Sequence, residues 1–120
     1  MTTTDPAATS IAPRVSIVHR PLCPSNMYVV TVQHAGTAYT VEVEANRSDA
    51  KLTGLYVEPI PAFDDIPSVL HMAGKALYVA AVRAYSAGDL PKHRLLIGIS
   101  GSIGVYARGL RHAMQGGHAA

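Results

Sequence analysis

A glycine-rich stretch near the C-terminus carries the residues whose types and spacing could bind an anion. Residues 95–110 read LLIGISGSIGVYARGL and place four glycines behind a short apolar run. A phosphate-binding turn needs unobstructed backbone amides at the start of a helix, whose partial positive charge faces the anion. The candidate ligand-binding positions in this stretch are small or cationic residues: Arg94, Gly98, Ser100, Gly101, Ser102 and Arg108.

The spacing of the glycines matches neither of the two common nucleotide-binding motifs. Gly98, Gly101 and Gly104 follow the pattern G-x-x-G-x-x-G. The dinucleotide fingerprint is G-x-G-x-x-G, and the P-loop ends in Gly-Lys followed by Ser or Thr. Glycines also allow two backbone segments to turn and pack closely. The sequence therefore leaves two interpretations open, a ligand-binding turn and a packing turn.

Residues 94–114, RLLIGISGSIGVYARGLRHAM, resemble the opening strand, turn and helix of the flavin-binding cysteine decarboxylases and the related flavin prenyltransferases. The resemblance covers about a sixth of the chain. It implies that Ser100, Gly101 and Ser102 would face the flavin. In that family the segment opens a much longer Rossmann-like domain, whose other flavin-contacting parts have no counterpart in this sequence. We therefore expect no cofactor.

The sequence favours neither catalysis nor metal binding. Cys23 is the only cysteine, and the six histidines show no metal-ligand spacing. Asp64 and Asp65 lie where a helix should begin, and helix capping explains them. We expect no catalytic residue, no metal site and no enzymatic activity. An enzyme that uses Cys23 with a histidine such as His19 or His34 is a weaker alternative.

Charge is sparse and unevenly distributed along the chain. Of the 120 residues, 48% are hydrophobic and 15% are charged, and the net charge is +2. Seven basic and four acidic residues lie after position 50, so the positive charge belongs to the C-terminal part. Such a weak basic patch allows a nucleic-acid partner but does not require one. A sparsely charged surface leaves apolar residues exposed, which favours burial against a protein partner or a second copy.

Alternation of apolar and polar residues predicts a sheet in the first half of the chain. Ala35 and Gly36 form a short turn between two β-branched or aromatic segments, which predicts a hairpin. Prolines end the flanking segments, because proline cannot donate to a strand ladder. Four segments are expected to be strands: residues 14–20, 27–33, 37–45 and 51–59.

Helical spacing of small apolar residues within the stretch 63–89 predicts a long helix that ends just before Gly88. After Pro91, residues 94–100 are expected to form a buried strand and residues 102–114 a shorter closing helix. The fold class is therefore α+β: a mainly antiparallel sheet of three to five strands, with one long helix packed on one face and a shorter C-terminal helix.

The domain boundaries follow from composition. We expect residues 1–13 to be a disordered tail, residues 14–115 a single domain and residues 116–120 a frayed end. We recognise no secretory signal and no membrane span, so we expect a cytoplasmic protein without a membrane partner.

These features favour a small binding module without catalysis. Its partner would be another protein, or a second copy bound through the sparsely charged face of the long helix. The alternative is a module that binds a phosphate-bearing ligand, namely a nucleotide, a flavin or RNA, at residues 94–108.

Overall fold

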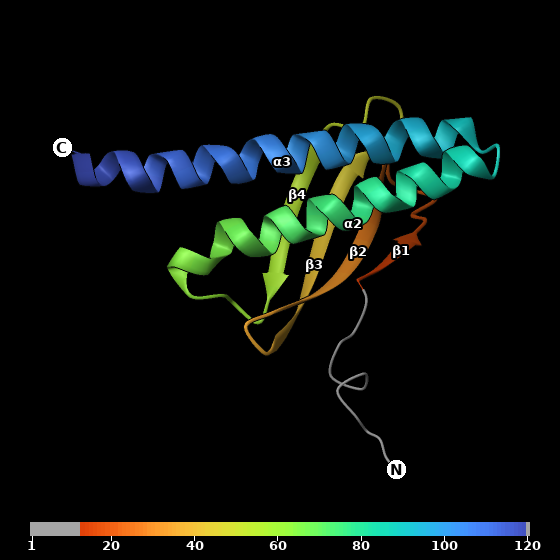
Figure 1. The fold of residues 1–120 in the computed structure, drawn as a ribbon. Coiled ribbons are helices and arrows are strands. Elements are labelled where there is room, and N and C mark those ends of the chain that lie inside the picture. Colours follow the sequence, from red (N-terminus) through yellow and green to blue (C-terminus); the bar gives the residue numbers. More distant parts are fainter. Residues whose placement is uncertain (1–12, 120) are drawn as a thin grey trace, which may run out of the picture.

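The computed structural model describes residues 13–119, in which four strands are followed by two long helices (Figure 1). The predicted tail, except for Pro13, lies outside the described residues. The fold class is confirmed, because an antiparallel sheet carries a long helix and a C-terminal helix on one face. Among the described residues, neither helix combines the length and hydropathy that a membrane span requires.

The sheet is an antiparallel meander in the order β1-β2-β3-β4. Its strands are β1 (Arg14–Val18), β2 (Ser25–His34), β3 (Thr37–Asn46) and β4 (Leu52–Glu58). The predicted hairpin joins β2 and β3, and its two turn residues, Ala35 and Gly36, both have positive φ. That turn geometry matches the twist of the flanking strands and so fixes their register.

The core lies between the sheet and the helices. Every second residue of β2 and β3 points to this side, and Val30 pairs with Val41 while Tyr28 pairs with Val43. Leu77 of α2 (Ile66–Ser86) lies in the same core. These five side chains are at most 1% exposed, so the alternation in the sequence corresponds to burial on one face.

The two helices form an antiparallel hairpin. The short 3-10 helix η1 (Phe63–Asp65) leads into α2, and a short turn that contains Gly88, at φ +82°, leads into α3 (Leu90–Ala119). Gly74 of α2 faces α3, because a methyl group placed on it would lie 3.5 Å from the Ile103 side chain. The helices are therefore in close contact along their shared side.

The predicted strand at residues 94–100 and the turn after it are wrong, because both lie inside the continuous helix α3. A short apolar run fits a buried strand and a buried helix equally well. Leu96, Ile99 and Ile103 are fully buried, and their spacing of three and four residues places them on one side of a helix. Burial of this side against the core outweighs the cost of roughly 1 kcal/mol for each internal glycine.

The C-terminal helix is consequently longer than the helix before it, with 30 residues against 21. The helix ends at Ala119.

Candidate functional site

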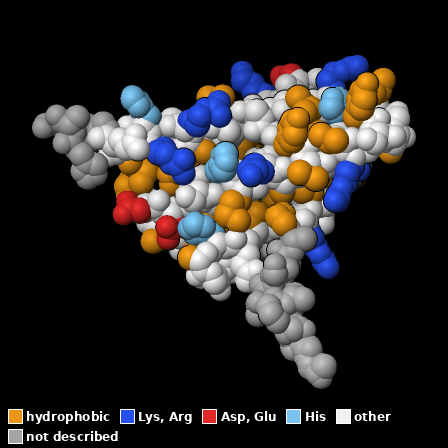
Figure 2. Space-filling model, viewed as in Figure 1, with side chains coloured by type: hydrophobic (Ala, Val, Ile, Leu, Met, Phe, Trp, Pro, Cys, Tyr) orange, Lys and Arg blue, Asp and Glu red, His pale blue; other side chains and the backbone are white. Residues whose placement is uncertain are grey.

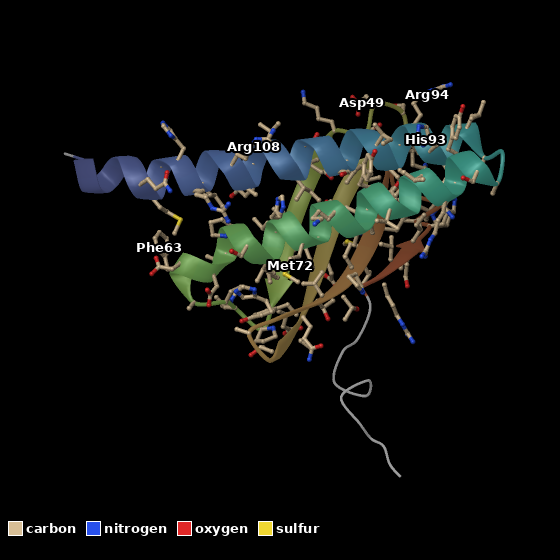
Figure 3. The ribbon with its side chains drawn as sticks, in the orientation of Figure 1. Asp49, Phe63, Met72, His93, Arg94 and Arg108 are labelled. Carbon is tan, nitrogen blue, oxygen red and sulfur yellow. The ribbon has the colours of Figure 1, made fainter. Side chains whose placement is uncertain are left out.

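All six residues of the predicted ligand-binding turn lie on α3. Backbone amides inside an α-helix donate to carbonyl oxygens of the preceding turn, so they cannot cradle a phosphate. Arg94 and Arg108 are well separated (Figure 3), since fourteen residues of helix span about 21 Å. The structure thus removes the amide cradle on which the phosphate-binding interpretation of this stretch depended.

Ser100, Ser102 and Gly98 take part in packing and hydrogen bonds of the fold. Ser100 Oγ donates a hydrogen bond of 2.8 Å to the Gly74 carbonyl of α2, and Ser102 Oγ donates one of 3.0 Å to the Gly98 carbonyl. A methyl group on Gly98 would come within 2.9 Å of Cβ of Ala50, in the loop between β3 and β4. At Gly98 the structure therefore supports the interpretation of close packing.

Three of the predicted residues nevertheless meet in one place. Ser100, Gly101 and Arg108 line a shallow depression of about 320 Å³ between the helices, which we call the α2–α3 depression. From α2 it is lined by His71, Gly74, Lys75, Tyr78 and Val79, and Gly104 completes it. Arg94, Gly98 and Ser102 do not line it.

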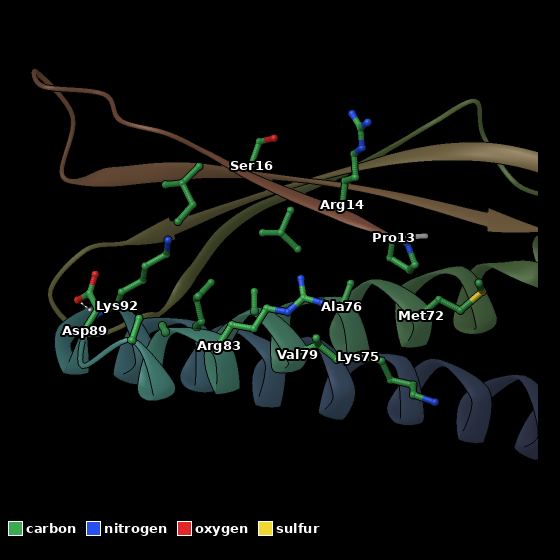
Figure 4. A pocket seen from close by; sticks show the side chains of 16 residues that line it. Pro13, Arg14, Ser16, Met72, Lys75, Ala76, Val79, Arg83, Asp89 and Lys92 are labelled. Carbon is green, nitrogen blue, oxygen red and sulfur yellow. Dashed lines mark hydrogen bonds between the residues drawn. The ribbon is translucent and has the colours of Figure 1, made fainter. Parts of the chain in front are cut away.

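A larger hollow lies where β1 meets the side of α2 (Figure 4), and we call it the β1–α2 groove. Its volume is about 1030 Å³. It exists because α2 packs mainly over β2, which leaves the inner side of the edge strand β1 partly uncovered. It is lined by Pro13, Arg14, Val15, Ser16, Ile17, Met72, Lys75, Ala76, Val79, Ala80, Arg83, Ala84, Ala87, Asp89, Lys92 and Leu96.

The β1–α2 groove is apolar inside and basic around its rim. It is lined by Lys75, Arg83 and Lys92 of the helices and by Arg14, whose side chain points away from α2 (Figure 4), and none of the four forms an ion pair among the described residues. The single carboxylate of the lining, Asp89, accepts a hydrogen bond of 3.2 Å from the Lys92 amide and so caps the start of α3. The groove therefore carries unneutralised positive charge beside apolar surface.

An exposed apolar stripe on α2 runs beside the groove, and we call it the α2 ridge. It consists of Tyr78, Val79, Val82 and Tyr85, which are between 44% and 62% exposed. Val79 lines both the groove and the α2–α3 depression, so the ridge separates the two hollows. Figure 2 shows this face as a mixture of basic and hydrophobic side chains, with acidic ones at its margins.

Sequence reasoning missed the groove. The sparsely charged face of the long helix was the one visible signal for a surface in need of a partner. The contribution of β1 could not be read from the sequence, since it depends on where α2 crosses the sheet.

Other reactive side chains lie apart or serve the fold. Cys23 is a free, half-buried thiol in the loop after β1, and no hydrogen bond joins it to a histidine within the described chain. His93 Nδ1 lies 2.8 Å from the Ala81 carbonyl, and the His93 ring packs against Tyr85 at 5.1 Å, so this histidine ties α3 to α2. No cluster of three potential metal ligands is found among the side chains of residues 13–115.

The β1–α2 groove and the α2 ridge thus form one surface with a distinct chemistry, apolar and basic. Comparison with protein-family models, with curated proteins and with solved structures finds no match to this chain.

Proposed function

We propose that this chain is a protein-interaction module without catalytic activity, which binds an acidic partner protein through the β1–α2 groove and the α2 ridge. The observation that carries this function is the groove itself, about 1030 Å³ of hollow surface whose helix cations, Lys75, Arg83 and Lys92, have no ion-pair partner among the described residues. The proposed location is the cytoplasm, and a fluorescent fusion in the source cells tests it.

The α2 ridge supplies apolar contact energy. Full burial of a valine or phenylalanine side chain contributes roughly 1.5–3 kcal/mol, and the ridge residues are about half exposed. Burying the exposed parts of these four side chains would therefore contribute about 4 kcal/mol to binding, before the costs of association are subtracted. That is enough to support specific binding when the cations add electrostatic complementarity.

A partner of opposite charge fits this surface better than a second copy of the chain. A symmetric dimer through the α2 ridge would bring Lys75 and Arg83 of both copies to one interface. Like charges at an interface oppose association. We therefore expect a monomer by light scattering at tens of micromolar protein, and a dimer that dissociates on Val82→Glu would favour self-association instead.

A photo-cross-linking experiment tests the proposed surface. The photoreactive residue p-benzoylphenylalanine replaces Tyr78 on the ridge, or Tyr56 on the opposite face of the sheet as a control. The two tyrosines are 54% and 56% exposed, so exposure does not separate them. We expect a protein adduct in the source cells only from position 78.

The interaction that the adduct reveals must then be reproduced with purified components. The partner identified by mass spectrometry should bind the purified chain, and Arg83→Glu should weaken that binding while Arg94→Glu should not. Arg94 is an exposed cation outside the groove, which makes it a matched charge control. Equal adducts from both positions, or none from position 78, would refute the proposed surface.

A specific observation also supports a second candidate function, the binding of a phosphate-bearing ligand. Ser100, Gly101 and Arg108 line the α2–α3 depression together with Lys75 and His71, so two cations and a histidine surround one hollow. Titration with flavin mononucleotide, ATP and short RNA, followed through the amide signals of Gly101 and Gly104, tests this function. Amide shifts that disappear in Arg108→Gln would support it, and unmoved amides would rule it out.

A further inference from the structure

We infer that the acidic partner binds as an extended segment that adds a fifth strand to the free edge of β1, above the β1–α2 groove, an inference that rests on the proposed function. The segment would carry two apolar side chains two residues apart, with carboxylates on either side. This fixes both the conformation and the chemistry of the partner.

The edge of β1 is free to accept a strand. The sheet order gives β1 one neighbour, β2, and leaves its other side without one in the described chain. An edge strand presents unpaired backbone donors and acceptors, which an extended peptide can use. Pro13 and Pro21 lie on either side of β1, so the usable edge is the five-residue strand, about 16 Å long.

The groove lies where the side chains of an added strand would point. Val15 and Ile17 pair with the buried residues Val30 and Tyr28, so they face the helices. Every second side chain of a strand next to β1 would face the same way. Opposite them, Ala76, Ala80 and Ala84 recur every four residues along α2, and these small side chains leave room for two apolar side chains of the incoming strand.

The cations select the charge of the segment. Lys92 lies with Asp89 at one end of the groove, Pro13 and Met72 lie at the other, and Arg83 reaches between β1 and α2 (Figure 4). A bound strand covers this space, so cations left there without carboxylates would lose hydration with no compensation. Carboxylates flanking the apolar pair would compensate them.

Three other occupants fit the groove less well. A second copy could offer its own β1 or β2, but residues 6–41 contain no Asp or Glu. Residues 1–12 of the chain offer a single carboxylate, Asp5. Nucleic acid would match the charge, but single strands bind on aromatic stacking platforms, and no aromatic side chain lines the groove.

The test uses the full chain and a fluorescein-labelled peptide with the core Glu-Glu-Val-Ser-Val-Glu-Glu. Fluorescence anisotropy at physiological salt should give a Kd below about 1 mM, and the amide signals of Val15 and Ile17 should shift. The same peptide with Lys in place of Glu should not bind. Arg83→Glu should weaken binding about fivefold, and the control Arg94→Glu should change it less than about twofold, because salt screens charges beyond about 8 Å.

N-methylation of the peptide backbone, one residue at a time, distinguishes a strand from other bound forms. A strand directs alternate amides towards β1, so methylation at every second position should weaken binding about tenfold and the intervening positions should have little effect. A flat profile, equal binding of the lysine peptide, or a Kd above about 1 mM would overturn strand addition. If the cross-linked partner still requires Arg83 in that case, the proposed function stands and only the binding mode fails.

Discussion

Alanine substitution at Gly98 and Gly101 should change stability in opposite directions, although the two glycines lie three residues apart on the same helix. Glycine costs a helix interior roughly 0.8–1.0 kcal/mol relative to alanine. A methyl group on Gly101 meets nothing within 4 Å, so Gly101→Ala should raise the free energy of unfolding by about 0.8 kcal/mol.

At Gly98 the same gain in helix stability is opposed by a steric clash. The new Cβ would lie 2.9 Å from Cβ of Ala50, which is 8% exposed and whose amide donates to the Asn46 carbonyl at 2.9 Å. That hydrogen bond restrains the loop from yielding. Overpacking of this kind costs about 1–3 kcal/mol, so Gly98→Ala should lower stability by about 1 kcal/mol net.

Removing the opposing methyl group identifies the cause. Ala50 has φ +60°, a conformation that suits glycine, so Ala50→Gly alone should be close to neutral. In the Ala50→Gly background the clash is gone, and Gly98→Ala should then stabilise by about 0.8 kcal/mol, as Gly101→Ala does.

Urea and thermal unfolding followed by circular dichroism measure all four variants. Gly98→Ala and Gly101→Ala should differ by about 2 kcal/mol, or about 8 °C in Tm for a domain of this size. If Gly101→Ala destabilises by 1 kcal/mol or more, the segment is a glycine-dependent turn and not a helix. If the effect of Gly98→Ala is the same with and without Ala50→Gly, the contact between these residues does not exist.

Three further substitutions test the packing of the fold. Leu77→Ala should lower the free energy of unfolding by about 2–5 kcal/mol, because the side chain is fully buried between α2 and the sheet, and chemical denaturation measures the loss. Gly88→Ala should lower the free energy of unfolding by about 1 kcal/mol, because Gly88 has a φ of +82°, and calorimetry should record a lower Tm. An unchanged Tm would mean that this turn has another conformation. Arg47→Met should cost about 1–3 kcal/mol, because Arg47 Nη1 donates to the buried Asn26 side chain and to the Arg20 carbonyl, both at 3.1 Å. Hydrogen exchange after Arg47→Met should rise first at the start of β2, and uniform exchange would contradict that role.

The sequence was sufficient for the parts of the fold that local patterns determine. The β2–β3 hairpin follows from strict alternation on both sides of a turn at Ala35 and Gly36, and α2 follows from apolar spacing that ends before Gly88. The first half of α3 was misread, because its apolar run and glycines fit a strand and a turn as well as a helix. The contacts that decide between them, Ser100 with Gly74 and Gly98 with Ala50, join segments distant in the sequence.

The candidate site could not be predicted from local patterns, because it also depends on segments that are distant in the sequence. Of the predicted ligand-binding residues, Ser100, Gly101 and Arg108 lie around one depression, while Arg94, Gly98 and Ser102 do not line it. The β1–α2 groove depends on the position of α2 over the sheet, which no spacing within either segment encodes. What the sequence did reveal was a long helix with a sparsely charged face.

The division of the fold into a sheet layer and a helix layer also separates its charges, and this has a kinetic consequence. Residues 66–115 contain six basic and one acidic side chain, whereas residues 13–65 contain four basic and six acidic ones. The molecule therefore has an electric dipole directed from the sheet towards the helices. A negatively charged partner that diffuses nearby experiences a torque that turns the helix layer towards it, so more encounters begin in a productive orientation. The association rate constant, more than the dissociation rate constant, should therefore fall as ionic strength rises.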